Sequence, residues 1–147
     1  MELIQELVGS RVFIDTSPFI YFIEGHNQYA SVMKEIFQRV DSGHIEAITS
    51  TITLLEVLVQ PFRKGDEALA DRYKEILLNS RGLTTFEITH DVSQRAASLR
   101  ARFSLRTPDA LQISVARTHR AAKFLTNDRH LKRVSQIVNV AVLDDFL

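Results

Sequence analysis

The sequence contains no cysteine, and this absence excludes two classes of protein. Without cysteine the chain can form neither a disulfide scaffold nor a thiolate metal site, and a reducing compartment suits it. Glycine and proline are also scarce, with five and three residues, and no stretch rich in proline, glycine or serine interrupts the sequence as a linker would. We therefore expect a single domain covering residues 1–147.

Long apolar runs are absent as well. No run approaches the roughly 20 residues that a helix needs to span a bilayer. The first ten residues, MELIQELVGS, carry acids where a signal peptide carries basic residues. These features predict a cytoplasmic protein that does not enter a membrane.

Several motifs of well-known enzymes are also missing. The sequence has no GxSxG elbow, no Walker loop and no GxGxxG fingerprint, which argues against serine hydrolases and nucleotide-dependent enzymes. None of the histidines has the HExxH or a similar ligand spacing, so they do not predict a zinc site. The histidines are His26, His44, His90, His119 and His130.

The sequence does contain a regular alternation of short β-rich segments and longer segments with helical periodicity. We expect strands at 11–15, 45–50, 83–88, 123–126 and 137–143, with the last at an edge of the sheet. Such alternation is typical of βαβ units and a parallel sheet. The predicted fold class is α/β, with about five parallel strands between two layers of helices.

Two proline-containing pairs predict helix starts. Ser17 followed by Pro18 reads as a cap and a first helical residue, and Thr107 followed by Pro108 reads in the same way. The remaining helices are expected at about 28–41, 51–62, 66–79 and 90–103.

Four acidic residues stand out because each lies next to or within a predicted element boundary: Asp15, Glu56, Asp109 and Asp128. In an open α/β sheet, ligands bind beyond the carboxyl ends of the strands, where Asp15 and Asp128 are expected. Carboxylates are the ligands that Mg²⁺ and Mn²⁺ prefer, and such sites commonly serve phosphate chemistry. The four acids therefore predict metal-assisted phosphodiester hydrolysis.

Each acid also has an ordinary structural explanation. Asp15 could cap a helix, although Ser17 is expected to do so. Asp109 is favoured by the helix dipole in a first turn, Asp128 suits a turn, and Glu56 could face solvent. The four together are harder to explain in this way than any one of them.

Net charge is zero, yet basic residues are concentrated late in the chain. Between residues 91 and 133 there are ten basic residues against three acids, Asp91, Asp109 and Asp128. This stretch is either a solvated helix surface or a substrate surface for a polyanion. Arg106 and Arg129 are the RNA-binding candidates, because each lies within three residues of a candidate site acid. The ten basic residues are Arg95, Arg100, Arg102, Arg106, Arg117, Arg120, Lys123, Arg129, Lys132 and Arg133.

At these residues the chain resembles a PIN domain, and its size and layout resemble the VapC-type toxin ribonucleases of toxin–antitoxin pairs. The matching segments are VFIDTSPFIYFIEG, ITLLEVL, TPDALQISVA and FLTND. The resemblance implies that Asp15, Glu56, Asp109 and Asp128 are catalytic, and that the three aspartates bind Mg²⁺ or Mn²⁺. It also implies supporting roles for Thr16 and Thr126.

The resemblance further implies an RNA substrate, a cognate antitoxin as partner and a homodimer. The apolar segment FIYFIEG offers either a dimer surface or ordinary core packing. Many relatives carry another aspartate two residues after the last acid, where this chain has His130. The resemblance therefore supports tight binding of one metal ion more strongly than of a second.

Two other functions remain open at this point. One is a PIN-like module that binds RNA or protein without cutting. The other is a small metal-dependent phosphohydrolase, for which a DxD motif would be expected where this chain has Asp15-Thr16-Ser17.

Overall fold

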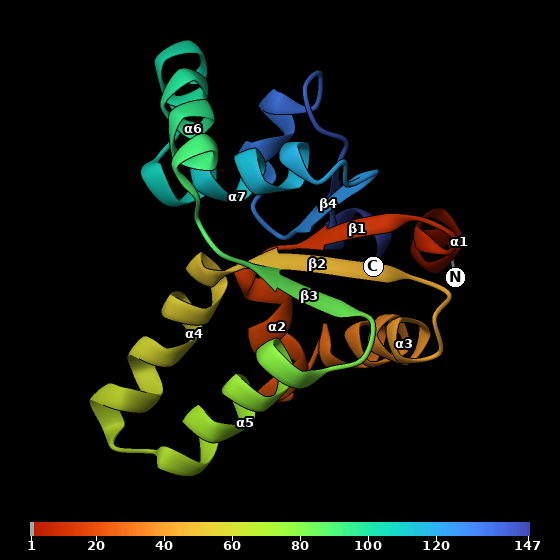
Figure 1. Ribbon diagram of the computed structural model, residues 1–147. Helices are drawn as coiled ribbons and strands as arrows, with labels where there is room; N and C mark the ends of the chain where they lie inside the picture. The colour runs from red at the N-terminus through yellow and green to blue at the C-terminus, as the bar shows by residue number, and fades with distance from the viewer. Residues whose placement is uncertain (1) are drawn as a thin grey trace.

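The computed structural model describes residues 2–147 and has three layers, with a parallel sheet between two sets of helices (Figure 1). The strands are β1 (Arg11–Ile14), β2 (Glu46–Ser50), β3 (Leu83–Phe86), β4 (Lys123–Thr126) and β5 (Val140–Val142). Their order in the sheet is β3-β2-β1-β4-β5, and every neighbouring pair is parallel. The predicted fold class, strand number and edge position of the last strand are confirmed.

The helices are distributed over both faces of the sheet (Figure 1). The α-helices are α1 (Glu2–Leu7), α2 (Thr16–Ile23), α3 (Ala30–Asp41), α4 (Thr51–Lys64), α5 (Glu67–Asn79), α6 (His90–Phe103) and α7 (Thr107–Thr118). Two 3₁₀ helices, η1 (Arg129–Val134) and η2 (Leu143–Phe146), flank β5.

Alternate residues of the strands feed two separate cores, as the two-residue period of a strand requires. Val12 and Ile14 of β1 pack on one face with residues from α1, α2, α3, α5 and η2. Phe13 points to the opposite face, where it stacks on Phe124 with ring centroids 5.0 Å apart and packs with residues from α6, α7 and η1. Burial on both faces explains why the strands read as almost continuous apolar runs.

The segment FIYFIEG serves core packing, which was one of its two predicted roles. Phe19 and Ile23 are buried in the first core, and Ile20, Tyr21 and Phe22 pack against it. Ile20, Tyr21 and Phe22 are only partly buried, so this segment also contributes apolar side chains to the surface. Homodimerisation stays a prediction.

Several predicted boundaries differ from the structure. The third strand ends at Phe86 rather than residue 88, and the fifth is confined to Val140–Val142. The segment Arg129–Val134 forms a 3₁₀ helix that the sequence did not predict, because so short an element has no helical periodicity. Within residues 2–147, no helix is both long and apolar enough to cross a membrane.

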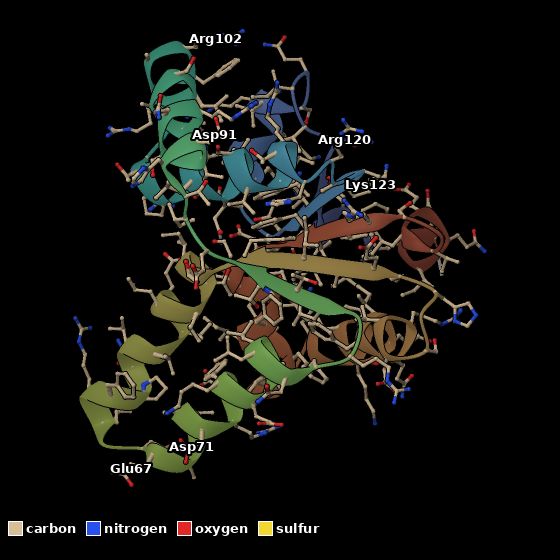
Figure 2. All side chains as sticks on the ribbon, in the orientation of Figure 1. Glu67, Asp71, Asp91, Arg102, Arg120 and Lys123 are labelled. Carbon is tan, nitrogen blue, oxygen red and sulfur yellow. The ribbon has the colours of Figure 1, made fainter. Side chains whose placement is uncertain are left out.

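The charges are unevenly placed on this frame. Figure 2 shows Arg102, Arg120 and Lys123 on or near the α6–α7 side of the sheet together with one acid, Asp91 of α6, and Glu67 and Asp71 at the far end of the α4–α5 pair. The ten basic residues and three acids of residues 91–133 are balanced by an excess of acids over the rest of the chain.

Candidate active site

Asp15 occupies the junction between β1 and α2, at the carboxyl end of the central strand. Its backbone is extended, with φ of −72° and ψ of 176°, and its Oδ1 accepts a hydrogen bond from the Thr16 N–H at 2.9 Å. Asp15 is therefore itself the N-cap of α2. The prediction that Ser17 caps this helix was wrong, because the helix begins at Thr16, two residues before the predicted first helical residue Pro18.

Two further side chains bind the Asp15 carboxylate. The Thr126 hydroxyl at the end of β4 donates to Oδ2 at 2.8 Å, and the Gln112 amide of α7 donates to Oδ1 at 3.4 Å. Burial raises the pKa of Asp15 to about 6, and the nearby Asp109 charge adds to this effect, while the hydrogen bonds oppose it. A carboxylate held in this way would gain from a cation beside it.

Glu56 lies on the exposed side of α4 and is tied to the site through Thr16. The Thr16 hydroxyl donates to Oε1 of Glu56 at 2.6 Å. Helix α4 starts directly after β2, and Ser50 caps it by accepting from the Ile52 N–H at 3.1 Å. The end of the strand thus sets where Glu56 lies, about one and a half turns into the helix.

Asp109 lies in the first turn of α7 and forms an ion pair within the site. Its Oδ2 accepts from Arg106 Nε at 3.0 Å, and its side chain is only 14% exposed. Arg106 is the N-cap residue, without a side-chain cap bond, and the helix begins at Thr107. The prediction that Thr107 caps this helix was therefore wrong. The hydrogen bond and charge of Asp109, and then the charges of Asp128 and Glu56, raise the pKa of Arg106. Its guanidinium therefore interacts with three of the candidate acids.

Asp128 follows β4 and caps η1. Its Oδ1 accepts from the His130 N–H at 3.0 Å, and its own N–H donates to the Thr126 hydroxyl at 3.1 Å. Thr126 is fully buried and links Asp15 to Asp128 through one oxygen. Asp128 therefore has a structural role as the cap of η1, and it also lines the same cavity as the other candidate acids.

All four acids line one cavity of about 210 Å³. A second cavity of about 390 Å³ shares Arg106, Asp109 and Asp128 and adds His130 and Arg133. The structure therefore brings together side chains that are widely separated in sequence. The residues lining the first cavity are Asp15, Thr16, Ser17, Ile20, Glu56, Arg106, Asp109, Thr126 and Asp128.

A buried polar network beneath the acids was missed by the sequence reasoning. Gln112 of α7 donates to the Thr53 hydroxyl at 2.8 Å and accepts from Ser50, and all three side chains are buried. The signal was present in the spacing. Gln112 lies three residues after Asp109 and Thr53 three residues before Glu56, so each shares a helix face with a site acid.

The donor chemistry of the cavity fits a hard divalent cation, because its acidic ligands are all carboxylates and are joined by hydroxyl oxygens. Within residues 2–147, however, no three acidic or histidine side chains lie close enough together to hold a metal ion as they stand. Asp109 faces Arg106 instead. A cation would have to compete with this guanidinium and draw the carboxylates towards Asp15.

The two RNA-binding candidates differ in position. Arg106 lines both cavities and lies beside Asp109. Arg129 donates from Nη1 to Asp145 Oδ1 at 2.8 Å, and Lys132 pairs with the same carboxylate. Arg129 thus neutralises an acid of η2, which weakens the case for it as a phosphate contact.

The fold and the site define a class, namely parallel α/β proteins with carboxylates gathered at the carboxyl ends of the strands. A model of the PIN domain matches residues 12–137 of the sequence. The chain therefore belongs to the PIN domain family. No protein with a curated description matches the sequence.

Solved structures share the fold at low sequence identity. A chain of VapBC2 from Rickettsia felis, solved bound to a DNA fragment from its promoter, is 16% identical, with a TM-score of 0.72 and coverage of 90% of this chain and 98% of that one. VapC20 of Mycobacterium tuberculosis, described as a toxin that cleaves the sarcin–ricin loop, is 19% identical, with a TM-score of 0.70 and coverage of 88% and 98%. A chain of a toxin–antitoxin complex from Klebsiella pneumoniae is 23% identical, with a TM-score of 0.66 and coverage of 89% of this chain and 96% of that one.

Proposed function

We propose that the chain is a metal-dependent endoribonuclease that hydrolyses phosphodiester bonds of single-stranded or structured RNA with Mg²⁺ or Mn²⁺. The observation that carries the proposal is the single cavity lined by Asp15, Glu56, Asp109 and Asp128. Membership of the PIN domain family supports it, and so does the shared fold with a toxin that cleaves the sarcin–ricin loop.

The four acids divide into two groups by their surroundings. Asp15, Asp109 and Asp128 are partly buried and would hold the cation, with Thr126 fixing the orientation of Asp15. A bound divalent cation supplies a Lewis acid and lowers the pKa of a water ligand. Glu56 is exposed at the cavity and held by Thr16, so its free oxygen can orient a water molecule or accept its proton.

Attack by that water on phosphorus forms one P–O bond and breaks the bond to the 3′ oxygen. The products are a 5′-phosphate and a 3′-hydroxyl, and the proton lost by the water balances the one gained by the leaving oxygen. Arg106 has N–H donors beyond the one directed at Asp109 and can bind a phosphate oxygen.

We further propose an antitoxin as protein partner. Leu55, Val59 and Phe62 recur at helical spacing on α4 and are 61%, 37% and 63% exposed. An apolar stripe of this kind is typical of a surface that a partner covers. The neighbours from Klebsiella pneumoniae and Rickettsia felis are components of toxin–antitoxin complexes, which supports the same reading.

The direct test is incubation of 5′-labelled structured RNA with the purified protein in Mg²⁺, in Mn²⁺ and in EDTA. We expect cleavage with both ions, none in EDTA, and fragments that carry 3′-hydroxyl ends. Hydrolysis of p-nitrophenyl phosphate without RNA cleavage would instead identify a phosphomonoesterase. RNA binding without any cleavage would identify a binding module.

A further inference from the structure

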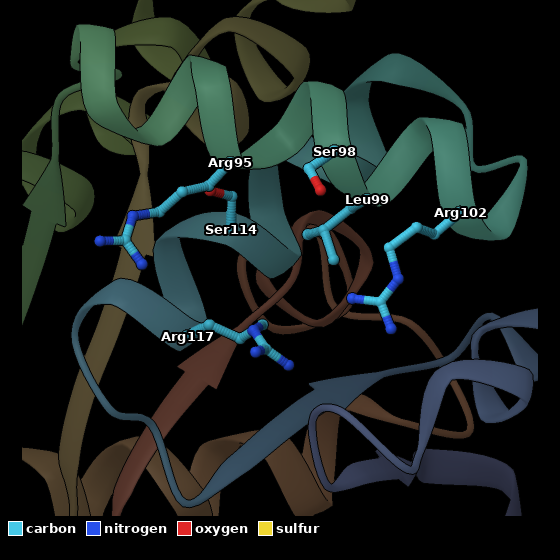
Figure 3. A pocket seen from close by; sticks show the side chains of 6 residues that line it. All are labelled: Arg95, Ser98, Leu99, Arg102, Ser114 and Arg117. Atoms are coloured by element: carbon cyan, nitrogen blue, oxygen red, sulfur yellow. The ribbon is translucent and has the colours of Figure 1, made fainter.

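A groove lined by arginine lies between α6 and α7, apart from the carboxylates (Figure 3). Its first part is a cavity of about 150 Å³, and it continues into a second cavity of about 450 Å³ through the shared residues Arg95 and Arg117. The first part is lined by Arg95, Ser98, Leu99, Arg102, Ser114 and Arg117, and the second adds Arg120, Ala121 and residues 135–139.

Figure 3 shows how the side chains are arranged in the first part of the groove. Arg102 reaches from α6 and Arg117 from α7 towards the same opening, and the Ser98 hydroxyl faces it between them. The Arg95 head turns outward at the other end. Leu99 forms an apolar floor and is buried.

The groove is cationic without a matching acid in its wall. Of the residues described, those that line either cavity include four arginines and no aspartate or glutamate. Only Arg95 pairs with a carboxylate, that of Asp91, and both side chains of this pair are more than 60% exposed. An exposed pair of this kind is weak and leaves the guanidinium available.

The other guanidinium groups retain unused donors. Arg117 gives one bond, from Nη1 to the Ile137 carbonyl at 2.8 Å, and Arg102 lies over the Phe103 ring at 5.0 Å. A guanidinium carries five N–H donors, so most of them remain free for a ligand. Arg120 adopts a left-handed φ of 56°, a conformation that favours glycine, yet an arginine stands there and lines the groove.

A basic path connects the groove with the carboxylate cavity. Arg133 lines the cavity next to Asp109 and donates to the carbonyls of Phe103 and Ser104, at the end of α6 that carries Arg102. Asp109 and Arg117 lie eight residues apart on α7, which corresponds to about 12 Å along the helix. A chain with a charge at every repeat could therefore contact both sites.

We propose that this arginine groove anchors the phosphodiester backbone of RNA while another part of the same strand occupies the carboxylate cavity. The inference rests on the proposed nuclease function for the identity of the polyanion. Guanidinium and hydroxyl groups bind phosphate without reading the base, so the groove supplies affinity and position rather than sequence preference.

The test compares the double variant R102A/R117A with R63A/K64A, which removes the same charge from exposed residues at the end of α4. Binding of a labelled 20-nucleotide RNA is titrated in Ca²⁺ over a range of salt concentrations. We expect R102A/R117A to bind at least about tenfold more weakly. Its plot of log affinity against log salt should be shallower by about 1.4, from about 0.7 for each of two phosphates. R63A/K64A should bind like wild type.

A charge-conserving variant separates electrostatic binding from damage to the fold. R102K/R117K keeps both charges and should recover most of the affinity and slope, and the single variant R102A should show about half the slope change. Circular dichroism of every variant should match wild type. Unchanged RNA binding by R102A/R117A would overturn the proposal. It would also be overturned if R102A/R117A lost binding to an acidic peptide but bound RNA like wild type.

The binding result is independent of cleavage, so the two proposals can fail separately. Absence of RNA cleavage by the wild type would count against the nuclease while the salt slopes remained readable. If the nuclease is confirmed, R102A/R117A should raise KM for the 20-nucleotide RNA and leave cleavage of a dinucleotide unchanged. Equal loss on both substrates would contradict an anchoring role.

Discussion

Asp15 affects the stability of the folded protein in two opposite ways. As N-cap of α2 it stabilises the helix, whereas its burial beside Asp109 destabilises its charged form. Because its pKa is about 6 instead of 3.8, the folded protein binds this proton more tightly than the unfolded chain. Stability contributed by the neutral form is therefore lost as pH rises from about 4 to about 6, and it stays lost at higher pH.

We expect Asp15→Asn to stabilise the metal-free protein at pH 8 by up to about 3 kcal/mol, because the amide removes the cost of a buried charge. The gain should largely disappear at pH 4. Thermal unfolding in EDTA, followed by circular dichroism, measures the stability difference between variant and wild type at both pH values. Asp91→Asn, an exposed acid on α6, is the control and should show no such pH dependence. A variant that is less stable than wild type at pH 8 would contradict the assigned burial.

Arg106 acts as a counter-ion to Asp109, and a divalent cation must compete with it. We therefore expect Arg106→Ala to increase the shift in Tm that millimolar Mn²⁺ produces, and at the same time to weaken RNA binding. Ligand-induced stabilisation follows RT ln(1 + [L]/Kd), so a tenfold gain in affinity adds about 1.4 kcal/mol. Arg63→Ala on α4 is a matched control. An unchanged or smaller Mn²⁺ shift in Arg106→Ala would mean that the guanidinium does not compete with a cation.

The positions of the candidate acids are set by where the strands end and the helices begin. The ends of β1 and β4 set Asp15 and Asp128, and the starts of α4 and α7 set Glu56 and Asp109. Alternating β and α patterns in the sequence predicted this arrangement, because parallel strands all end at the same edge. The exact helix starts were not predictable from Ser-Pro and Thr-Pro, because the preceding Asp15 and Arg106 adopt extended backbone and take the cap position.

Gly82 directly precedes the edge strand β3 and lies against Val40 of α3. Its φ is +78°, and a Cβ there would lie 2.5 Å from the Val40 carbonyl oxygen. Gly82→Ala should therefore cost the left-handed strain of about 1–2 kcal/mol and a further amount for the clash. Gly65→Ala is the matched control, since its φ is +66° and nothing lies within 4 Å of the added Cβ. Equal losses in urea unfolding would show that the Val40 contact is unimportant.

On the scale of the molecule, the fold was predictable because burial on both faces of a parallel sheet leaves a strong apolar signal. Asp15, Asp109 and Asp128 were found because each stands at or near an element end, and Glu56 because it is a single carboxylate in the apolar helical segment ITLLEVL. The network of Gln112, Thr53 and Ser50 was missed, since burial of a polar side chain is decided by tertiary packing. The sequence predicted a basic stretch over residues 91–133 that contains all four groove arginines, but not the groove, which forms only when α6, α7 and residues 135–139 come together.

The central claim is that the four acids act as one metal-dependent site for RNA cleavage. The most direct measurement is the single-turnover rate of RNA cleavage in Mn²⁺ by wild type, Asp15→Asn, Glu56→Gln, Asp109→Asn and Asp128→Asn, with His130→Ala as control. We predict losses of at least about 100-fold in the acid variants, because each removes a charge that the transition state requires. Circular dichroism should be unchanged, and His130→Ala should cleave at nearly the wild-type rate. Full activity in Asp15→Asn and Asp109→Asn, with folded protein, would contradict the account.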